Sequence, residues 1–294
     1  MHARWPLHLM FLPGALLLLI YHYIPTFGFV IAFQHFIPAK GITGSEWVGW
    51  ENFSYLIKLP NFYNVIWNTF YISIMKVAAG LVFPIVIALL LNELRSRFVK
   101  RSVQTLIYLP HFMSWIILGG IMIDILSPTR GIINQLLAVF GIEPLFFLGS
   151  PDMFPYVLVG SDLWKDFGFS TIVYLAALTG INPNLYEAAV IDGANRWKQT
   201  VYITLPGMAP VIILMATLSL GQILNAGFEQ VFNLYNPAVY ETGDIIDTLV
   251  YRMGLVQAQY SLATAVGLFK SFVSLILISF SYMLAYRFAN YRIF

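Results

Sequence analysis

The sequence contains no cysteine and has few charged residues. Without cysteine there is no disulfide, no thiolate nucleophile and no thiolate metal site. Charged residues make up 10% of the 294-residue chain, whereas soluble domains contain about 25%. The formal net charge of +2 gives no reason to expect nucleic acid as a partner. These shortages point away from a soluble domain and toward a protein that lies in lipid.

The motifs of nucleotide hydrolysis and nucleophilic catalysis are also missing. No G-x-x-x-x-G-K-[ST] loop occurs, and the stretch GANRWK at 193–198 lacks the second glycine of that loop. No G-x-S-x-G elbow occurs either. We therefore expect a chain that is not an enzyme and holds no cofactor or metal of its own. The histidines have no partners at metal-ligand spacing; they are His2, His8, His22, His35 and His111.

Apolar residues are abundant, at 59% of the chain. A transmembrane helix needs about 20 mostly apolar residues in a row. The sequence therefore predicts an all-α membrane protein with six transmembrane helices in a single domain, 1–294. The expected spans are 7–34, 62–93, 103–126, 154–180, 205–230 and 262–287.

Lysine and arginine in the short loops predict the orientation, because positive charge collects on the cytoplasmic side. With the N-terminus inside, the inner segments hold nine such residues and the outer segments hold four. Both termini and the 181–206 loop are then cytoplasmic. The nine are Arg4, Arg95, Arg97, Lys100, Arg101, Arg196, Lys198, Arg287 and Arg292, and the four are Lys40, Lys58, Arg130 and Arg252.

The 181–206 loop is an unusually polar stretch with its own helix signals. Asn182 is a good N-cap, and Pro183 suits the first position of a helix. Gly193 allows a backbone conformation that other residues resist, so we expect the helix to break there. A second piece, from Ala194 to Thr204, leads into the fifth span. Because Ala188 and its neighbour Ala189 are small, another protein's backbone could approach closely beside Glu187.

Two readings of this loop remain open on composition alone. It could be a docking surface for a cytoplasmic protein. It could also be an amphipathic helix on the lipid surface, which Trp197 and Lys198 would suit.

The spacing within this loop resembles a family signature. Glu187-Ala188-Ala189, then Gly193, Ile203 and Leu205-Pro206 reproduce the EAA loop of the permease subunits of binding-protein-dependent ABC importers. The resemblance extends over essentially the whole chain. The run from Trp164 to Pro206 is similar to the maltose- and oligosaccharide-type branch. The segments DTLVYR at 247–252 and NYR at 290–292 are similar to its polysaccharide-uptake members, which import oligosaccharides from pectin, xylan or related polymers.

This resemblance implies a type I ABC importer permease fold with a cytoplasmic coupling helix. It implies a multi-pass protein of the bacterial cytoplasmic membrane that moves an oligosaccharide from a plant or bacterial polysaccharide into the cytoplasm. The implied partners are a second, related permease in a heterodimer, two cytoplasmic ATPases that hold ATP and Mg, and an extracytoplasmic sugar-binding protein. The implied coupling residues are Glu187, Ala188, Ala189, Asp192, Gly193, Ile203, Leu205 and Pro206.

Ionisable groups inside spans mark either a pathway or an internal pair. For Lys76 and Lys270 a place in the substrate path and an internal salt bridge are equally open. Asp124 and Asp162 lie close enough to a span end to be solvated.

A sugar is bound by aromatic faces and by planar polar groups that match its hydroxyls. Helical spacing predicts that Gln222, Asn225 and Glu229 share one face of the fifth span. Hydrogen bonding between helices is the alternative for each polar residue. The candidates for the path are Trp164, Asp166 and Phe169 on the fourth span, and Ser219, Gln222, Asn225, Phe228 and Glu229 on the fifth.

The resemblance adds two assignments. Asp166 and Phe169 match sugar-contact positions of maltose-type permeases, where the family has glycine and tyrosine, which implies a sugar other than maltose. The corresponding positions of the fifth span fall near Ile223, Leu224 and Gly227 and are too apolar to inherit a role.

Three other functions stay in view. The chain could be an ABC importer permease for a solute that is not a sugar. An ion-coupled secondary transporter would have inverted repeats and broken helices, and no repeated pair of glycine-interrupted spans is present. A membrane glycosyltransferase would need clustered carboxylates at one interface, and the charges here are dispersed.

Overall fold

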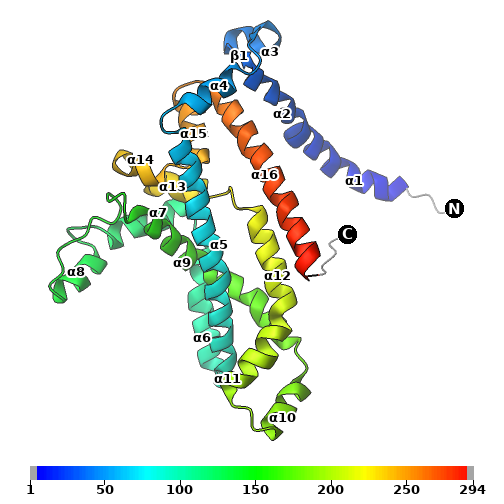
Figure 1. The fold of residues 1–294 in the computed structure, drawn as a ribbon, viewed down its shortest axis with the longest axis vertical. Coiled ribbons are helices and arrows are strands. Elements are labelled where there is room, and N and C mark those ends of the chain that lie inside the picture. Colours follow the sequence, from blue (N-terminus) through cyan, green and yellow to red (C-terminus); the bar gives the residue numbers. More distant parts are fainter. Residues whose placement is uncertain (1–4, 290–294) are drawn as a thin grey trace. The chain divides into compact units, whose positions relative to one another are not determined.

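The computed structural model describes residues 5–289, and most of them are helical (Figure 1). The chain divides into two compact units. Unit 1 comprises the described parts of Met1–Tyr63 together with Ile246–Phe272. Unit 2 comprises Asn64–Ile245 and the described part of Val273–Phe294.

Several helices are long and apolar enough to cross a membrane. Within residues 5–289 there are four: His8–Phe33, Phe62–Glu93, Arg196–Gly221 and Tyr260–Met283. A fifth candidate is the pair Arg97–Phe112 and Trp115–Ile125, which is bent by 107°. Helix α9 (Phe154–Thr179) has 26 residues but carries three charged side chains, so it is not among them. The protein is thus a mostly helical membrane protein, and the count of six spans stays a prediction.

Unit 1 is built from the first helix, the following loop and part of the last helix. The first helix runs through α1 (Trp5–Leu18), a π-turn (Leu19–Tyr23), α2 (Ile24–Thr26) and a 3₁₀ segment (Phe27–Phe33). The loop holds a short antiparallel pair, β1 (Gln34–His35) with β2 (Glu46–Trp47), and the helices α3 (Gly41–Gly44) and α4 (Glu51–Lys58). α15 (Ile246–Tyr251), a second π-turn (Arg252–Val256) and the beginning of α16 (Tyr260–Ala289) complete the unit.

Unit 2 contains the long helices α5 (Phe62–Glu93), which enters it at Asn64, and α9. The described part of α16 from Val273 onward also belongs to it, and its remaining elements are shorter. In chain order they are α6 (Arg97–Tyr108), a 3₁₀ turn (Leu109–Phe112), α7 (Trp115–Ile125), α8 (Ile132–Val139), α10 (Pro183–Ile191), α11 (Arg196–Gln199), a π-turn (Thr200–Thr204), α12 (Leu205–Gly221), α13 (Phe228–Leu234), a 3₁₀ turn (Pro237–Val239) and α14 (Tyr240–Gly243).

Two apolar clusters form the core of unit 2. One surrounds the buried side chains of Ile72, Phe154 and Leu158, and the other surrounds Tyr174 and Met208. α9 contributes to both clusters and also packs against α6 and α12. The helix that carries the charged side chains is therefore held at the centre of its unit.

α5 and α9 coincide closely with the ranges expected for the second and fourth spans, but two other expectations need correction. The expected helix 103–126 is bent by 107°, because Pro110 interrupts the helix and Ser114 caps a new one through Ile117 N. The expected fifth span, 205–230, is shifted. Its helix begins at Arg196, since the π-turn keeps α11 and α12 continuous, and it ends at Gly221.

Candidate functional site

The 181–206 loop folds as its sequence signals indicate. α10 is capped by Asn182, whose side chain accepts a hydrogen bond from Asn184 N at 3.0 Å. Gly193 follows the helix with a φ of 78°, in the left-handed region that favours glycine. Asn195 then caps the second helix by accepting from Lys198 N at 2.9 Å. The result is two short helices with a sharp bend between them.

One surface of this loop is unusually open and apolar. Within the described residues, Ile191 is 86% exposed and Trp197 is 74% exposed. Glu187 and Ala188 are exposed beside them on α10. A charge next to small and apolar side chains can be recognised by another protein, so the geometry suits the docking reading of this loop.

Internal contacts anchor the loop to its own unit. The Tyr186 hydroxyl lies 2.9 Å from the Thr204 hydroxyl, which ties α10 to the start of the next span. Arg196 Nη1 lies 3.9 Å from Glu93 Oε2 at the end of α5. Figure 1 shows α10 and α11 together at the end of unit 2 where α5 ends. These contacts link α10 to the π-turn before α12, and α11 to the end of α5.

A polar cavity of about 420 Å³ lies between α5, α9 and the region around the end of α12. Five residues predicted for the substrate path line it: Lys76, Asp166, Ser219, Gln222 and Asn225. Asp162, Ser73, Ser170, Tyr174 and Gly227 also contribute to its wall. The Ser73 hydroxyl is buried and has no hydrogen-bond partner within the described residues. The cavity wall therefore contains an unsatisfied polar group.

The other predicted path residues lie elsewhere. Trp164 lines a separate, apolar cavity of about 510 Å³ together with Tyr156 and Met122. Phe228 and Glu229 begin α13, beyond the end of the fifth span. Lys270 lies in unit 1 and pairs with Asp247 at 2.5 Å, as the salt-bridge alternative anticipated.

The prediction that Gln222, Asn225 and Glu229 share one helical face is wrong. α12 ends at Gly221, and α13 starts only at Phe228 after Gly227, whose φ is 92°. The non-helical segment 222–227 nevertheless brings Gln222 and Asn225 to the cavity. Non-helical backbone at membrane depth must find its hydrogen bonds inside the protein.

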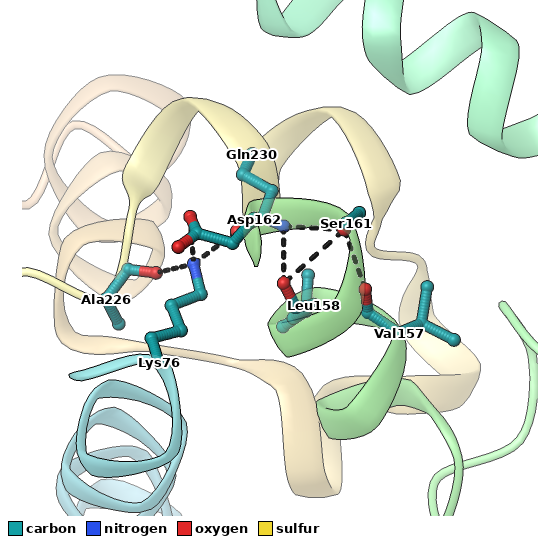
Figure 2. A network of polar contacts seen from close by, with 7 residues as sticks. All are labelled: Lys76, Val157, Leu158, Ser161, Asp162, Ala226 and Gln230. Carbon is teal, nitrogen blue, oxygen red and sulfur yellow. Dashed lines mark hydrogen bonds and ion pairs between the residues drawn. The ribbon is translucent and has the colours of Figure 1, made fainter. Parts of the chain in front are cut away.

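Lys76 supplies one of those bonds and stands in a buried network (Figure 2). Its ammonium group donates to Ala226 O at 2.7 Å, to Asp162 Oδ1 at 3.0 Å and to Gln230 Oε1. Gln230, which is fully buried, in turn donates to Leu158 O and to the Ser161 hydroxyl, each at 2.7 Å. The network joins α5, α9 and α13. It also corrects the expectation that Asp162 is simply solvated.

His111, which sequence reasoning left without a partner, meets both residues that the resemblance assigned to the sugar path. Its Nδ1 lies 2.8 Å from Asp166 Oδ1, and its ring stacks on Phe169. Lys165 donates to His111 O at 2.8 Å and to Met113 O at 2.7 Å. The bend between α6 and α7 is thus fixed to α9. His111 and Asp166 are 55 positions apart, so no sequence spacing could have predicted their contact.

A helical protein of several spans, with an exposed glycine-bent loop and a polar cavity among its helices, has the construction of a membrane transporter. The chain belongs to the family described as binding-protein-dependent transport system inner membrane component, whose model matches residues 80–293. It is therefore the permease subunit of an ABC importer, a multi-pass inner membrane protein whose ATPase is a separate subunit. This confirms the family that the EAA spacing indicated. It also excludes the two other hypotheses, an ion-coupled secondary transporter and a membrane glycosyltransferase.

Individual relatives lie close to this chain. It is 44% identical to the polygalacturonan/rhamnogalacturonan transport system permease protein YteP of Bacillus subtilis (strain 168) over 288 residues, covering 98% of this chain and 90% of YteP. A solved chain of a bacterial ABC transporter that imports the acidic polysaccharide alginate superposes with a TM-score of 0.90 at 39% identity, covering 97% of this chain and 96% of the other. A second structure, the alginate transporter in complex with an alginate pentasaccharide-bound periplasmic protein, gives a TM-score of 0.89. The fold is that of an ABC importer permease.

Proposed function

We propose that this permease imports an oligosaccharide derived from a plant or bacterial polysaccharide. The observation that carries the proposal is the 44% identity over nearly the whole chain to a permease named for polygalacturonan and rhamnogalacturonan transport. The alginate transporter, at 39% identity, supports the same class of substrate. A binding protein outside the cytoplasm would deliver this oligosaccharide.

The polar cavity is the proposed passage. Gln222 and Asn225 are exposed and offer planar amides to sugar hydroxyls. The Ser73 hydroxyl, which is buried and has no hydrogen-bond partner among the described residues, lies in the same wall. A cavity with these groups suits a hydroxyl-rich ligand better than an apolar one. Trp164, Phe169, Phe228, Glu229 and Lys270 do not line it, and their part in the path stays a prediction.

The 181–206 loop is the proposed contact with the ATPase. Glu187 would meet a basic group there, while Ala188 and Ala189 would allow close approach. Gly193 supplies the bend, and the Tyr186–Thr204 and Arg196–Glu93 contacts would pass movement to the spans. The complete set is Glu187, Ala188, Ala189, Asp192, Gly193, Ile203, Leu205 and Pro206.

The proposed assembly has six spans in this chain, with α9 and the bent α6–α7 pair among them and both termini in the cytoplasm. A second, related permease would pair with it as a heterodimer, and two cytoplasmic ATPases would bind ATP and Mg. Closure of the ATPases would open the cavity outward to receive the sugar, and hydrolysis would return it inward.

The test is uptake into proteoliposomes that contain the complete transporter, with ATP inside and the sugar-loaded binding protein outside. Oligogalacturonides, alginate oligomers and neutral oligosaccharides of equal length are compared with an amino acid. ATP-dependent uptake of at least one oligosaccharide, and none of the amino acid, is expected. Uptake of the amino acid alone would favour the alternative, an importer for a solute other than sugar.

A further inference from the structure

We infer that Lys76 is a positioning residue, whose role is to hold the broken end of the fifth span so that Gln222 and Asn225 face the cavity. This inference rests on the proposed function of the cavity. It differs from the role in the substrate path that a lysine inside a membrane span suggests.

The first step is a count of donors. An ammonium group has three N–H bonds and no acceptor. Lys76 has three acceptors around it: Asp162 Oδ1, Ala226 O and Gln230 Oε1. Its side chain is 8% exposed. In this conformation no donor is left for a sugar, although the residue lies in the cavity wall.

The second step concerns the acceptor at Ala226. The Ala226 carbonyl lies in the non-helical segment 222–227, and lipid offers it no hydrogen-bond donor. Lys76 Nζ provides a donor at 2.7 Å. The next residue, Gly227, has a φ of 92°, and a side chain there would start only 3.1 Å from the same nitrogen. The break in the span is therefore formed around the lysine.

The third step is that one of the other two acceptors, Gln230, is held in place by further hydrogen bonds. Gln230 uses its carbonyl for Lys76 and both amide N–H bonds for Leu158 O and Ser161 Oγ on α9. Ser161 is itself held by Val157 O at 2.6 Å. Figure 2 shows Asp162 of α9 and Gln230 of α13 beside the amine, with Ser161 linked to the amide nitrogen of Gln230. A fully satisfied network of this kind defines one geometry.

The experiment uses the absence of cysteine, which makes one introduced cysteine a unique labelling site. A nitroxide label is placed on Asn225→Cys in the broken segment, and separately on Ser219→Cys in regular helix α12. Both are studied in the complete transporter in proteoliposomes, with partner cysteines replaced. The mobility of each label is read from its electron paramagnetic resonance spectrum.

The test variant is Lys76→Met/Asp162→Asn, which removes both charges together, so that neither is left without its partner. It should make the label at 225 more mobile and leave the label at 219 unchanged. The matched control is Lys165→Met, which removes another half-buried lysine of α9. Its amine donates to His111 O and Met113 O and lies 5.7 Å from the centroid of the Trp115 ring.

Sugar uptake by the double variant should fall about tenfold, because misplaced binding groups lose most of their effect. Unchanged mobility at 225 in the double variant would overturn the inference, whatever happens to uptake. Mobility at 225 that rises equally in Lys165→Met would also overturn it, because the effect would then be general. The spectra do not depend on sugar, so failure of the proposed substrate class would leave this test readable.

Discussion

The imidazole of His111 stacks on the ring of Phe169, with centroids 4.1 Å apart and planes within 4°. The same imidazole contacts Asp166 through Nδ1. One face of Phe169 and one oxygen of Asp166 are therefore occupied by a residue from the bend between α6 and α7. A sugar that uses this part of α9 meets all three residues together.

We predict that His111→Ala lowers sugar uptake about tenfold, because Phe169 and Asp166 lose the group that orients them. His111→Phe should retain part of the activity, since it keeps the stacked ring but loses the contact with Asp166. Initial uptake rates in proteoliposomes measure both. His8→Ala, at an exposed position of the first helix, is the control. Full uptake by His111→Ala would show that the stack has no part in transport.

α9 packs closely against α6 at Gly168, so we predict that a side chain added at this position destabilises the protein. A Cβ at Gly168 would lie 2.0 Å from Ile107 O, whereas a Cβ at Gly160 on the same helix would meet nothing within 4 Å. Gly168→Ala should therefore destabilise the protein by about 1–3 kcal/mol, the usual effect of overpacking. Gly160→Ala should be neutral or slightly stabilising, because alanine is the better helix former. Thermal unfolding of the two purified variants compares them, and equal midpoints would contradict the packing described here.

At Gly193 the effect of backbone conformation can be tested separately from steric crowding. Its φ is 78°, and nothing lies within 4 Å of a Cβ built there. Gly193→Val should strain the bend by about 1–2 kcal/mol, while Gly193→Asn should be tolerated because asparagine enters the left-handed region more readily. ATP-driven uptake should follow the same order, with valine far below asparagine. If asparagine and valine impair uptake equally, space rather than backbone conformation limits this position.

The Tyr186–Thr204 hydrogen bond predicts a milder defect. Tyr186→Phe removes only the hydroxyl, and a hydrogen bond of this kind contributes about 1 kcal/mol. We expect fewer sugar molecules imported per ATP hydrolysed, because α10 would be less firmly tied to the start of the fifth span. Tyr202→Phe, whose side chain is 75% exposed, is the comparison and should leave this ratio unchanged. The same loss in both variants would remove the proposed role of the contact.

The 181–206 loop could be predicted in detail because its signals are local. Asn182, Pro183 and Gly193 each act through the backbone of their immediate neighbours, and the structure shows the cap, the helix start and the left-handed bend that they predict. The long apolar helix from Phe62 to Glu93 was predictable for the same reason, since hydrophobicity and length alone define it.

The cavity could be predicted only in part. Lys76, Gln222 and Asn225 stand out in the sequence as polar groups inside apolar segments, and the structure brings them to one cavity, but the sequence does not predict the helix end at Gly221. No local signal marks the helix end at Gly221, and the hydrogen bond from Lys76 to Ala226 O in the broken segment joins positions 150 apart in the chain. Gln230 and His111 were missed for the same reason: their partners lie on other helices.

The position of α10 against the ATPase is tested most directly by crosslinking. Ala188→Cys places one reactive thiol on the exposed surface of the loop, in a chain that has no other cysteine. A short bifunctional reagent, applied to the complete transporter during ATP-driven uptake, should join residue 188 to the cytoplasmic ATPase subunit. Modification of residue 188 only by reagents added from outside the cell, or no link to the ATPase during active uptake, would contradict the coupling role of this loop.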